Sequence, residues 1–239
     1  MFHKNTMVAC GWLLFLFLIP TVQGDGPKTY EILKANYQKG NVQIYYPQVI
    51  RMKDVHKQEI INRIIQNDVF GDEVQYYEKL GNGSDYELDY KIQLEGPNLL
   101  SIEYLGYRYE KGTPHPTQIF YTTNINLHQG TRLQLKDVVT IDKAFIEKLK
   151  KSRYRPWNSN LDWQSDAYRY ALMNLNDEQL IEELNHADDL QSGYNTFSYF
   201  TQDSLGISLG LPHALGDHAE FEIKYREIAR NIKKNILGK

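Results

Sequence analysis

Residues 86–138 place the strongest constraint on how this chain can fold. Apolar and polar side chains alternate from Tyr86 to Leu94, so that tyrosine, leucine and isoleucine share one face and charged or amide side chains share the other. A period of two with one polar face is typical of an antiparallel strand lying on a hydrophobic core. Strand-like runs at 100–109 and 119–127 follow, joined by short turns. The segment therefore predicts a twisted antiparallel sheet, and it contains no recognisable catalytic motif.

Helical patterns on both sides of this segment complete the fold prediction. Asp54 is a suitable N-cap for a helix that runs to about residue 68, with isoleucines at helical spacing. A hairpin is expected at residues 30–49, and further strands near residues 197–225. The other helices are expected at about 142–151, 165–173, 177–186 and 226–237. We predict the α+β class, a twisted antiparallel sheet with helices packed on it, as one continuous unit because no linker divides the chain.

Residues 1–24 have the pattern of a signal peptide. Lys4 precedes an apolar run at residues 7–19, and small residues before Asp25 suit cleavage there. The run is short for a membrane span, which needs roughly 20 residues, so membrane attachment is expected only if the segment stays as an uncleaved anchor. The single cysteine, Cys10, lies in this segment, so a cleaved chain has no thiol and no disulfide. We expect an exported protein, extracellular or in the cell envelope.

The charge of the cleaved chain excludes a general attraction for nucleic acid. Residues 1–24 contain one basic and no acidic residue, which leaves 26 basic against 30 acidic residues and a net charge of −4. A mildly acidic protein has no electrostatic reason to bind phosphate backbones or anionic lipid. We therefore expect no nucleic-acid partner.

Two sets of motifs resemble bacterial extracytoplasmic domains. The segment 42–49 and the isoleucine-rich helix at 60–65 resemble the N-terminal module of PdaC-type peptidoglycan deacetylases. The segments 111–116, 121–127 and 133–138, with 204–212 and 221–225 near the end, resemble the C-terminal domain of RsiV-type, lysozyme-sensing anti-sigma factors. The resemblance implies a PdaC-like module at 28–110 and an RsiV-like domain at 111–239. It implies no deacetylase activity, because that activity belongs to a separate domain.

The RsiV resemblance points to two loops, residues 111–117 and 211–220, as a binding surface. Exposed loops on a rigid sheet are a common location for binding sites. In this family the second loop commonly carries tyrosines, whereas this chain has His213 and His218 there. Trp157 stands in an aromatic and basic stretch that either binds a ligand or seals the sheet against the helices. The predicted ligand-binding residues are His115, Pro116, Pro212, His213, His218 and Trp157.

Two groups of histidine and acidic residues offer chemical alternatives to binding. His213, Asp217 and His218 are metal-ligand types, but their spacing matches no established motif, and a solvated loop is favoured. Asp188 and Asp189 are expected to form a solvated helix end rather than a cation site. We assign no catalytic residue, metal or cofactor.

The function expected from the sequence is that of a non-enzymatic envelope protein. Its partner is expected to be lysozyme or another wall-active protein, or the glycan of peptidoglycan. The alternative is a cell-wall-modifying hydrolase that uses carboxylates or a histidine-bound metal, because pairs of carboxylates that meet in space are invisible in a sequence.

Overall fold

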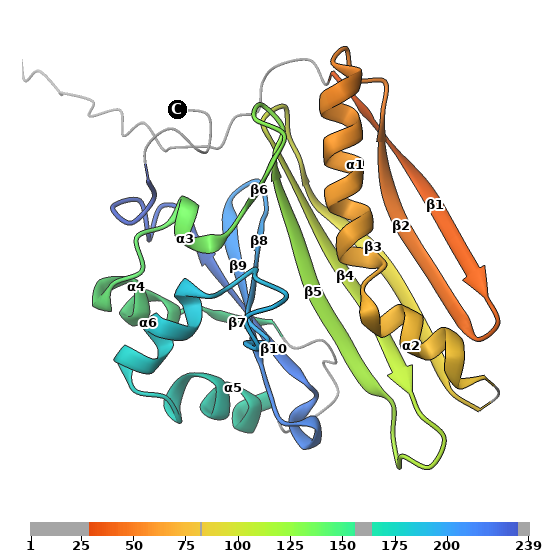
Figure 1. Ribbon diagram of the computed structural model, residues 1–239. Helices are drawn as coiled ribbons and strands as arrows, with labels where there is room; N and C mark the ends of the chain where they lie inside the picture. Colours follow the sequence, from red (N-terminus) through yellow and green to blue (C-terminus); the bar gives the residue numbers. More distant parts are fainter. Residues whose placement is uncertain (1–28, 82, 156–163, 234–239) are drawn as a thin grey trace, which may run out of the picture.

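The computed structural model describes residues 29–81, 83–155 and 164–233 (Figure 1). The described residues form two sheets. The strands of the larger sheet follow one another in chain order, and they are β1 (Glu31–Lys39), β2 (Val42–Ile50), β3 (Asp85–Glu95), β4 (Leu99–Tyr109), β5 (Thr117–Asn126) and β6 (Thr131–Leu133). The smaller sheet has the order β7-β10-β9-β8, made by β7 (Arg153–Arg155), β10 (His218–Lys224), β9 (Ser204–Gly210) and β8 (Phe197–Phe200).

Helices cover both sheets. The larger sheet carries α1 (Val55–Val69) and α2 (Asp72–Leu80) on one face. The smaller sheet is covered by α3 (Leu135–Val138), α4 (Lys143–Leu149), α5 (Gln164–Met173) and α6 (Asp177–Asn185). Strand β8 lies against β3, β4 and β5, so the two sheets meet between the two groups of helices. No helix among the described residues is long and apolar enough to cross a membrane.

The predicted α+β class is confirmed. The structure adds that the strands form two sheets and that one pairing is parallel, because α1 and α2 carry the chain from the end of β2 back to the start of β3. The strands on either side of the expected module boundary at 110–111, β4 and β5, are antiparallel neighbours over ten residue pairs. The continuity of the unit therefore comes from one shared sheet.

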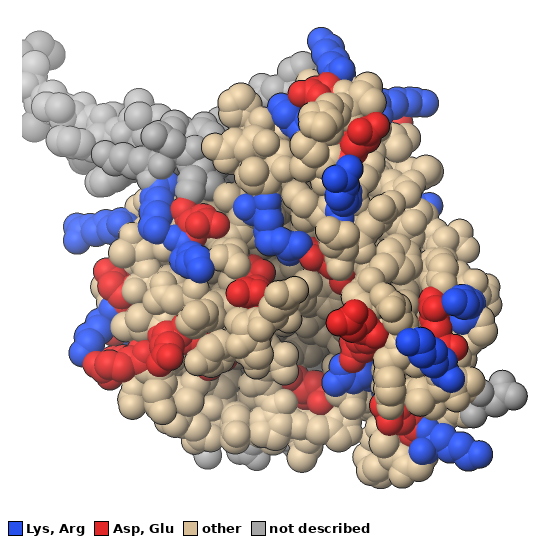
Figure 2. Space-filling view, viewed as in Figure 1, with Lys and Arg blue, Asp and Glu red and all other residues tan. Residues whose placement is uncertain are grey.

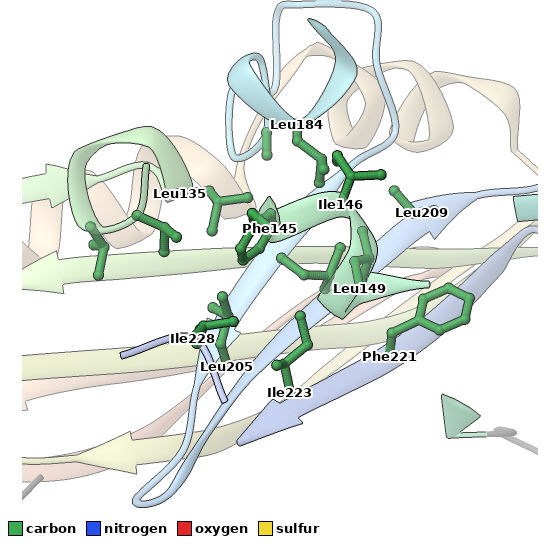
Figure 3. Packing of buried hydrophobic residues seen from close by; sticks show 14 of the residues in the cluster. Leu135, Phe145, Ile146, Leu149, Leu184, Leu205, Leu209, Phe221, Ile223 and Ile228 are labelled. Atoms are coloured by element: carbon green, nitrogen blue, oxygen red, sulfur yellow. The ribbon is translucent and has the colours of Figure 1, made fainter. Parts of the chain in front are cut away.

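Two apolar cores hold these layers. One lies between α1, α2 and the larger sheet, and it includes Ile61 and Ile65 of α1. The other lies between the smaller sheet and α3, α4 and α6, with Phe145 of α4 at its centre (Figure 3). Figure 3 shows apolar side chains from α4, from the strands and from the C-terminal turns pointing toward one another. The helical spacing of the isoleucines in α1 thus did predict the buried face of that helix.

One helix was missed and another was wrongly predicted. The first helix ends at Val69, close to the expected residue 68, but α2 follows at once, with Gly71 as its N-cap and Asp72 and Glu73 in its first turn. Acidic side chains at that position favour a helix N-terminus. The expected C-terminal helix is absent from its described part, residues 226–233, which form turns instead.

The C-terminal turns are held by pairing with a distant segment. Ile232 forms a bridge with Val139, and the backbone N–H of Lys233 donates to the carbonyl of Val138 at 2.8 Å. The side-chain amide of Asn231 donates to the Thr140 carbonyl at 3.0 Å. These contacts hold residues 231–233 against residues 138–140, and they override the helical spacing of the isoleucines.

Candidate functional site

A layer of polar side chains lies where the two sheets meet. The Thr122 hydroxyl and the Asn124 amide, both on β5, donate to the Ser198 carbonyl on β8 at 2.7 and 2.8 Å. The Ser101 hydroxyl donates to the Asn124 side chain at 2.7 Å and accepts from the backbone N–H of Phe200 at 2.9 Å. All these side chains except Phe200 are polar, and all are fully or almost fully buried. We call this layer the polar seam, and it fixes β8 on β5 through directional hydrogen bonds.

Asp188 joins the polar seam to the start of α3. Its carboxylate accepts from the backbone N–H groups of Ser198 at 2.6 Å and Leu135 at 2.8 Å. It also accepts from the hydroxyls of Ser198 at 2.6 Å and Thr122 at 3.2 Å. Burial raises the pKa of Asp188 to about 6, against the opposing effect of the Ser198, Leu135 and Thr122 hydrogen bonds. The solvated helix end expected at Asp188 is wrong, because this side chain is 2% exposed.

A second cluster of polar side chains includes Tyr199, the residue that follows Ser198 on β8. The Tyr199 hydroxyl donates to Glu220 at 3.0 Å and accepts from the Arg155 guanidinium at 3.1 Å. Burial, and next the charge of Glu220, raise the pKa of Glu103 on the facing sheet. Gly206 makes room for this packing, because a Cβ there would lie 2.1 Å from the Tyr199 ring.

A cleft opens beside the polar seam, along β5. Its smaller cavity, of about 320 Å³, lies between β5, residues 190–197 and the strands β9 and β10. Its larger cavity, of about 700 Å³, lies between the α1–α2 junction and residues 188–191. The two cavities share Glu73, Tyr121 and Leu190, so they are parts of one cleft. Figure 2 shows the hollow at the centre of this face, with acidic and basic side chains around it.

Two ion pairs line the cleft. Arg108 of β4 pairs with Glu73 of α2, and Arg132 of β6 pairs with Asp68 of α1. The Asp68 carboxylate also accepts from the Thr123 hydroxyl. Both arginines are therefore neutralised by a carboxylate of the neighbouring helix, and neither provides an unpaired positive charge.

The two loops predicted to bind a ligand lie side by side at one end of this cleft. Asp217 connects them, because its carboxylate accepts from the backbone N–H of Gln118 at 2.8 Å and contacts Nδ1 of His213 at 2.9 Å. The rings of His115 and His213 are 6.4 Å apart between centroids. Asp217 has a φ of +69°, a left-handed conformation that aspartate tolerates better than most residues. The two loops belong to the β4–β5 and β9–β10 hairpins, about 100 residues apart in the chain.

The predicted site residues fall into three groups. His115, Pro116, Pro212 and His213 are exposed on the two loops. His218 is 7% exposed, because it begins β10 and turns its ring onto Phe120, with the ring centroids 4.6 Å apart. Trp157 lies outside the described residues. The structure thus brings four of the six together and places His218 inside the cleft instead.

The histidine-bound metal site is not assembled in the part of the chain that the structure describes. No group of three or more His, Cys, Asp or Glu side chains there has the geometry to hold a metal ion. His213 pairs with Asp217 at the surface, while His218 faces the protein interior.

The cleft itself was missed by the sequence analysis. Its walls come from α1, α2, β3 to β6, the segment after α6, and β8 to β10, and only the fold brings these together. Asp188 and Asp217 both have a left-handed backbone, with φ values of +65° and +69°. This was the one local feature of the cleft to which the residue type is related. Aspartate is enriched in this conformation, but that preference does not reveal which aspartate is buried.

No model of a protein family matches the sequence of this chain. No curated protein matches it either. Solved structures do match its fold. A member of the DUF3298 family from Bacteroides fragilis is similar with a TM-score of 0.57 and 16% identity, over 90% of this chain and 98% of that one. A DUF3298 family protein from Pseudomonas aeruginosa gives a TM-score of 0.54 and 15% identity, with the same coverage. DUF3298 is the family of RsiV-like domains, so this chain has the fold that the sequence motifs indicated.

Proposed function

We propose that this protein is an exported, non-enzymatic binding module of the bacterial envelope, and that its partner is a protein of the lysozyme kind. The binding surface in this proposal consists of His115, Pro116, Pro212 and His213, and we call it the two-loop surface. The observation that carries the proposal is the meeting of two distant loops at one exposed site, held together by Asp217. The likeness in fold to DUF3298 proteins supports the proposal but assigns no ligand.

The two-loop surface has the properties of a preorganised recognition site. Pro114 and Pro116 restrict the backbone on either side of His115, and Pro212 does the same before His213. Asp217 orients the His213 ring. A rigid surface loses little conformational entropy when it binds, so its contacts contribute more fully to affinity. Both loops lie at the same end of the molecule, at the bottom of Figure 1.

The test is a titration of residues 25–239 against a panel of lysozymes and solubilised wall fragments. Calorimetry at two salt concentrations would measure affinity and its electrostatic part. We expect one-to-one binding to at least one lysozyme. The double variant His115→Ala, His213→Ala should weaken it at least about tenfold, because both rings would lie in the interface.

His128→Ala is the matched control for this titration. His128 is also an exposed histidine in a turn between strands, but it lies in the β5–β6 turn, at the other end of β5. Equal affinity of the wild type and the double variant would place the interface elsewhere. Absence of binding to every lysozyme would overturn the proposed partner, and turnover of the wall fragments would favour the hydrolase.

A further inference from the structure

We infer that the smaller cavity of the cleft is a binding site for a neutral, hydroxylated molecule about the size of one sugar ring. This cavity, which we call the β5 pocket, has a volume of about 320 Å³, at the lower end of the range for small-molecule sites. It lies beneath the two-loop surface, and the inference does not depend on what that surface binds.

Three side chains that line the β5 pocket have buried polar atoms without a partner. They are the hydroxyl of Tyr121 on β5, the hydroxyl of Ser208 on β9 and both ring nitrogens of His218 on β10. None of these atoms has a hydrogen-bond partner among residues 29–81, 83–155 and 164–233, and each side chain is more than nine-tenths buried. The Nε2 atom of His218 lies 3.6 Å from the Glu220 carboxylate, beyond hydrogen-bond distance.

The convergence of these atoms is the main argument for a ligand. A buried polar group without a partner destabilises a fold, so such groups are rare. Here three different strands each contribute one such side chain to the wall of the same cavity. A ligand that forms hydrogen bonds with them would satisfy all three at once.

The chemistry of these groups selects the ligand class. A phenol and an aliphatic hydroxyl each donate and accept hydrogen bonds, as the hydroxyls of a sugar do, and the imidazole ring adds two nitrogens that can bond to such hydroxyls. The charged side chains of the pocket are Glu73, Asp217 and Arg108, with Arg108 already paired to Glu73. Their net charge of −1 disfavours a phosphate or a carboxylate.

The remaining walls suit the carbon skeleton of a sugar. Phe120, Tyr194 and Phe197 are among the residues that line the pocket, and aromatic rings pack well against C–H groups. Asn195 and Gln118 add amide groups at the same pocket, which supply further donors and acceptors.

The test is ligand-observed NMR on the purified protein with four monosaccharides of matched size. Glucose and N-acetylglucosamine are neutral, glucosamine is a cation and glucuronate is an anion. We expect the two neutral sugars to bind saturably at millimolar concentrations and to compete for one site. Glucuronate should bind at least about tenfold more weakly, because of the acidic lining.

Single-atom variants locate the site. Ser208→Ala and Tyr121→Phe each remove one unpartnered hydroxyl, so each should lower the affinity for glucose about tenfold without lowering the melting temperature. Tyr104→Phe is the matched control. Its ring stacks on Tyr121 with centroids 4.6 Å apart and is fully buried, but it does not line the pocket.

Several results would overturn the inference. These are no saturable binding of either neutral sugar, glucuronate binding as tightly as glucose, or unchanged affinity in both Ser208→Ala and Tyr121→Phe. The His115→Ala, His213→Ala double variant should bind glucose normally, and Ser208→Ala should bind a lysozyme partner normally. These two controls separate failure of the β5 pocket from failure of the two-loop surface.

Discussion

The two apolar cores and the polar seam between the sheets solve the same packing problem in different ways. Each core buries a helix against a sheet with side chains such as Ile65 or Phe145, and its stability comes from apolar area removed from water. The seam buries Ser101, Asn124 and Asp188, and its groups are held by hydrogen bonds. Apolar packing tolerates small shifts, whereas a hydrogen-bonded layer demands one register. The cores therefore supply most of the stability. The seam fixes the position of one sheet on the other, and with it the position of the walls of the cleft.

The largest expected loss of stability comes from a substitution in an apolar core. Phe145→Ala should lower the free energy of unfolding by about 3–5 kcal/mol, because it leaves a cavity among fully buried side chains. Tyr76→Ala is the control, since Tyr76 is an aromatic residue of α2 that is 48% exposed, and it should cost less than about 1 kcal/mol. Chemical denaturation monitored by circular dichroism measures both. Similar losses in the two variants would mean that the core around α4 is not well packed.

The next largest loss of stability is expected from a substitution in the polar seam. Asp188→Ala removes the acceptor of four hydrogen bonds and leaves the backbone N–H groups of Leu135 and Ser198 buried without a partner. We expect a loss of about 2–4 kcal/mol at pH 7, measured by the same denaturation. Asp188 also lines the larger cavity, so the variant should admit solvent there, seen as faster amide exchange in β8 and α3 than elsewhere.

The comparison variant for Asp188→Ala is Asp188→Asn. Asparagine tolerates the left-handed conformation at this position and keeps one carbonyl oxygen, so the backbone geometry is retained. It should lose less stability than the alanine variant. Equal losses would show that the hydrogen bonds of the carboxylate, which both variants lack, and not tolerance of the left-handed backbone, are what the aspartate provides.

The sequence predicted the cores far better than the seam. Alternation at 86–94 and the isoleucine spacing in α1 reveal which faces are buried, because they depend only on neighbours in the chain. The N-cap Asp54 was also visible, since capping is local. The parallel β2–β3 pairing, in contrast, depends on the path that α1 and α2 take, which no local pattern specifies.

The candidate site was predictable only in its exposed part. Prolines marked the loops of His115 and His213, and both loops were identified. His218 was grouped with His213 because the RsiV resemblance places both in the loop at residues 211–220, but the strand that starts at His218 turns it inward. Asp188 bonds to residues 10, 53 and 66 positions away, so its burial follows from the tertiary fold alone.

The smallest expected effect is a pH dependence of stability that the polar seam has and the apolar cores lack. Burial raises the pKa of Asp188 to about 6 from 3.8, so the folded state holds this proton more tightly than the unfolded state. Its contribution to stability is therefore fully present below about pH 4 and is lost as the pH rises through 6. The expected change is up to about 3 kcal/mol, and the free energy of unfolding of the wild type relative to Asp188→Asn should fall by that amount between pH 4 and 7.

The difference between wild type and Asp188→Asn isolates this one group. Glu103, whose pKa is also raised by burial, titrates in both proteins and cancels. The apolar cores have no such dependence, so the Phe145→Ala loss should stay constant over the same range. If the free energies of unfolding of the wild type and Asp188→Asn changed in parallel with pH, the four hydrogen bonds to Asp188 would fully offset its burial. The seam would then stabilise the charged carboxylate as well as water does.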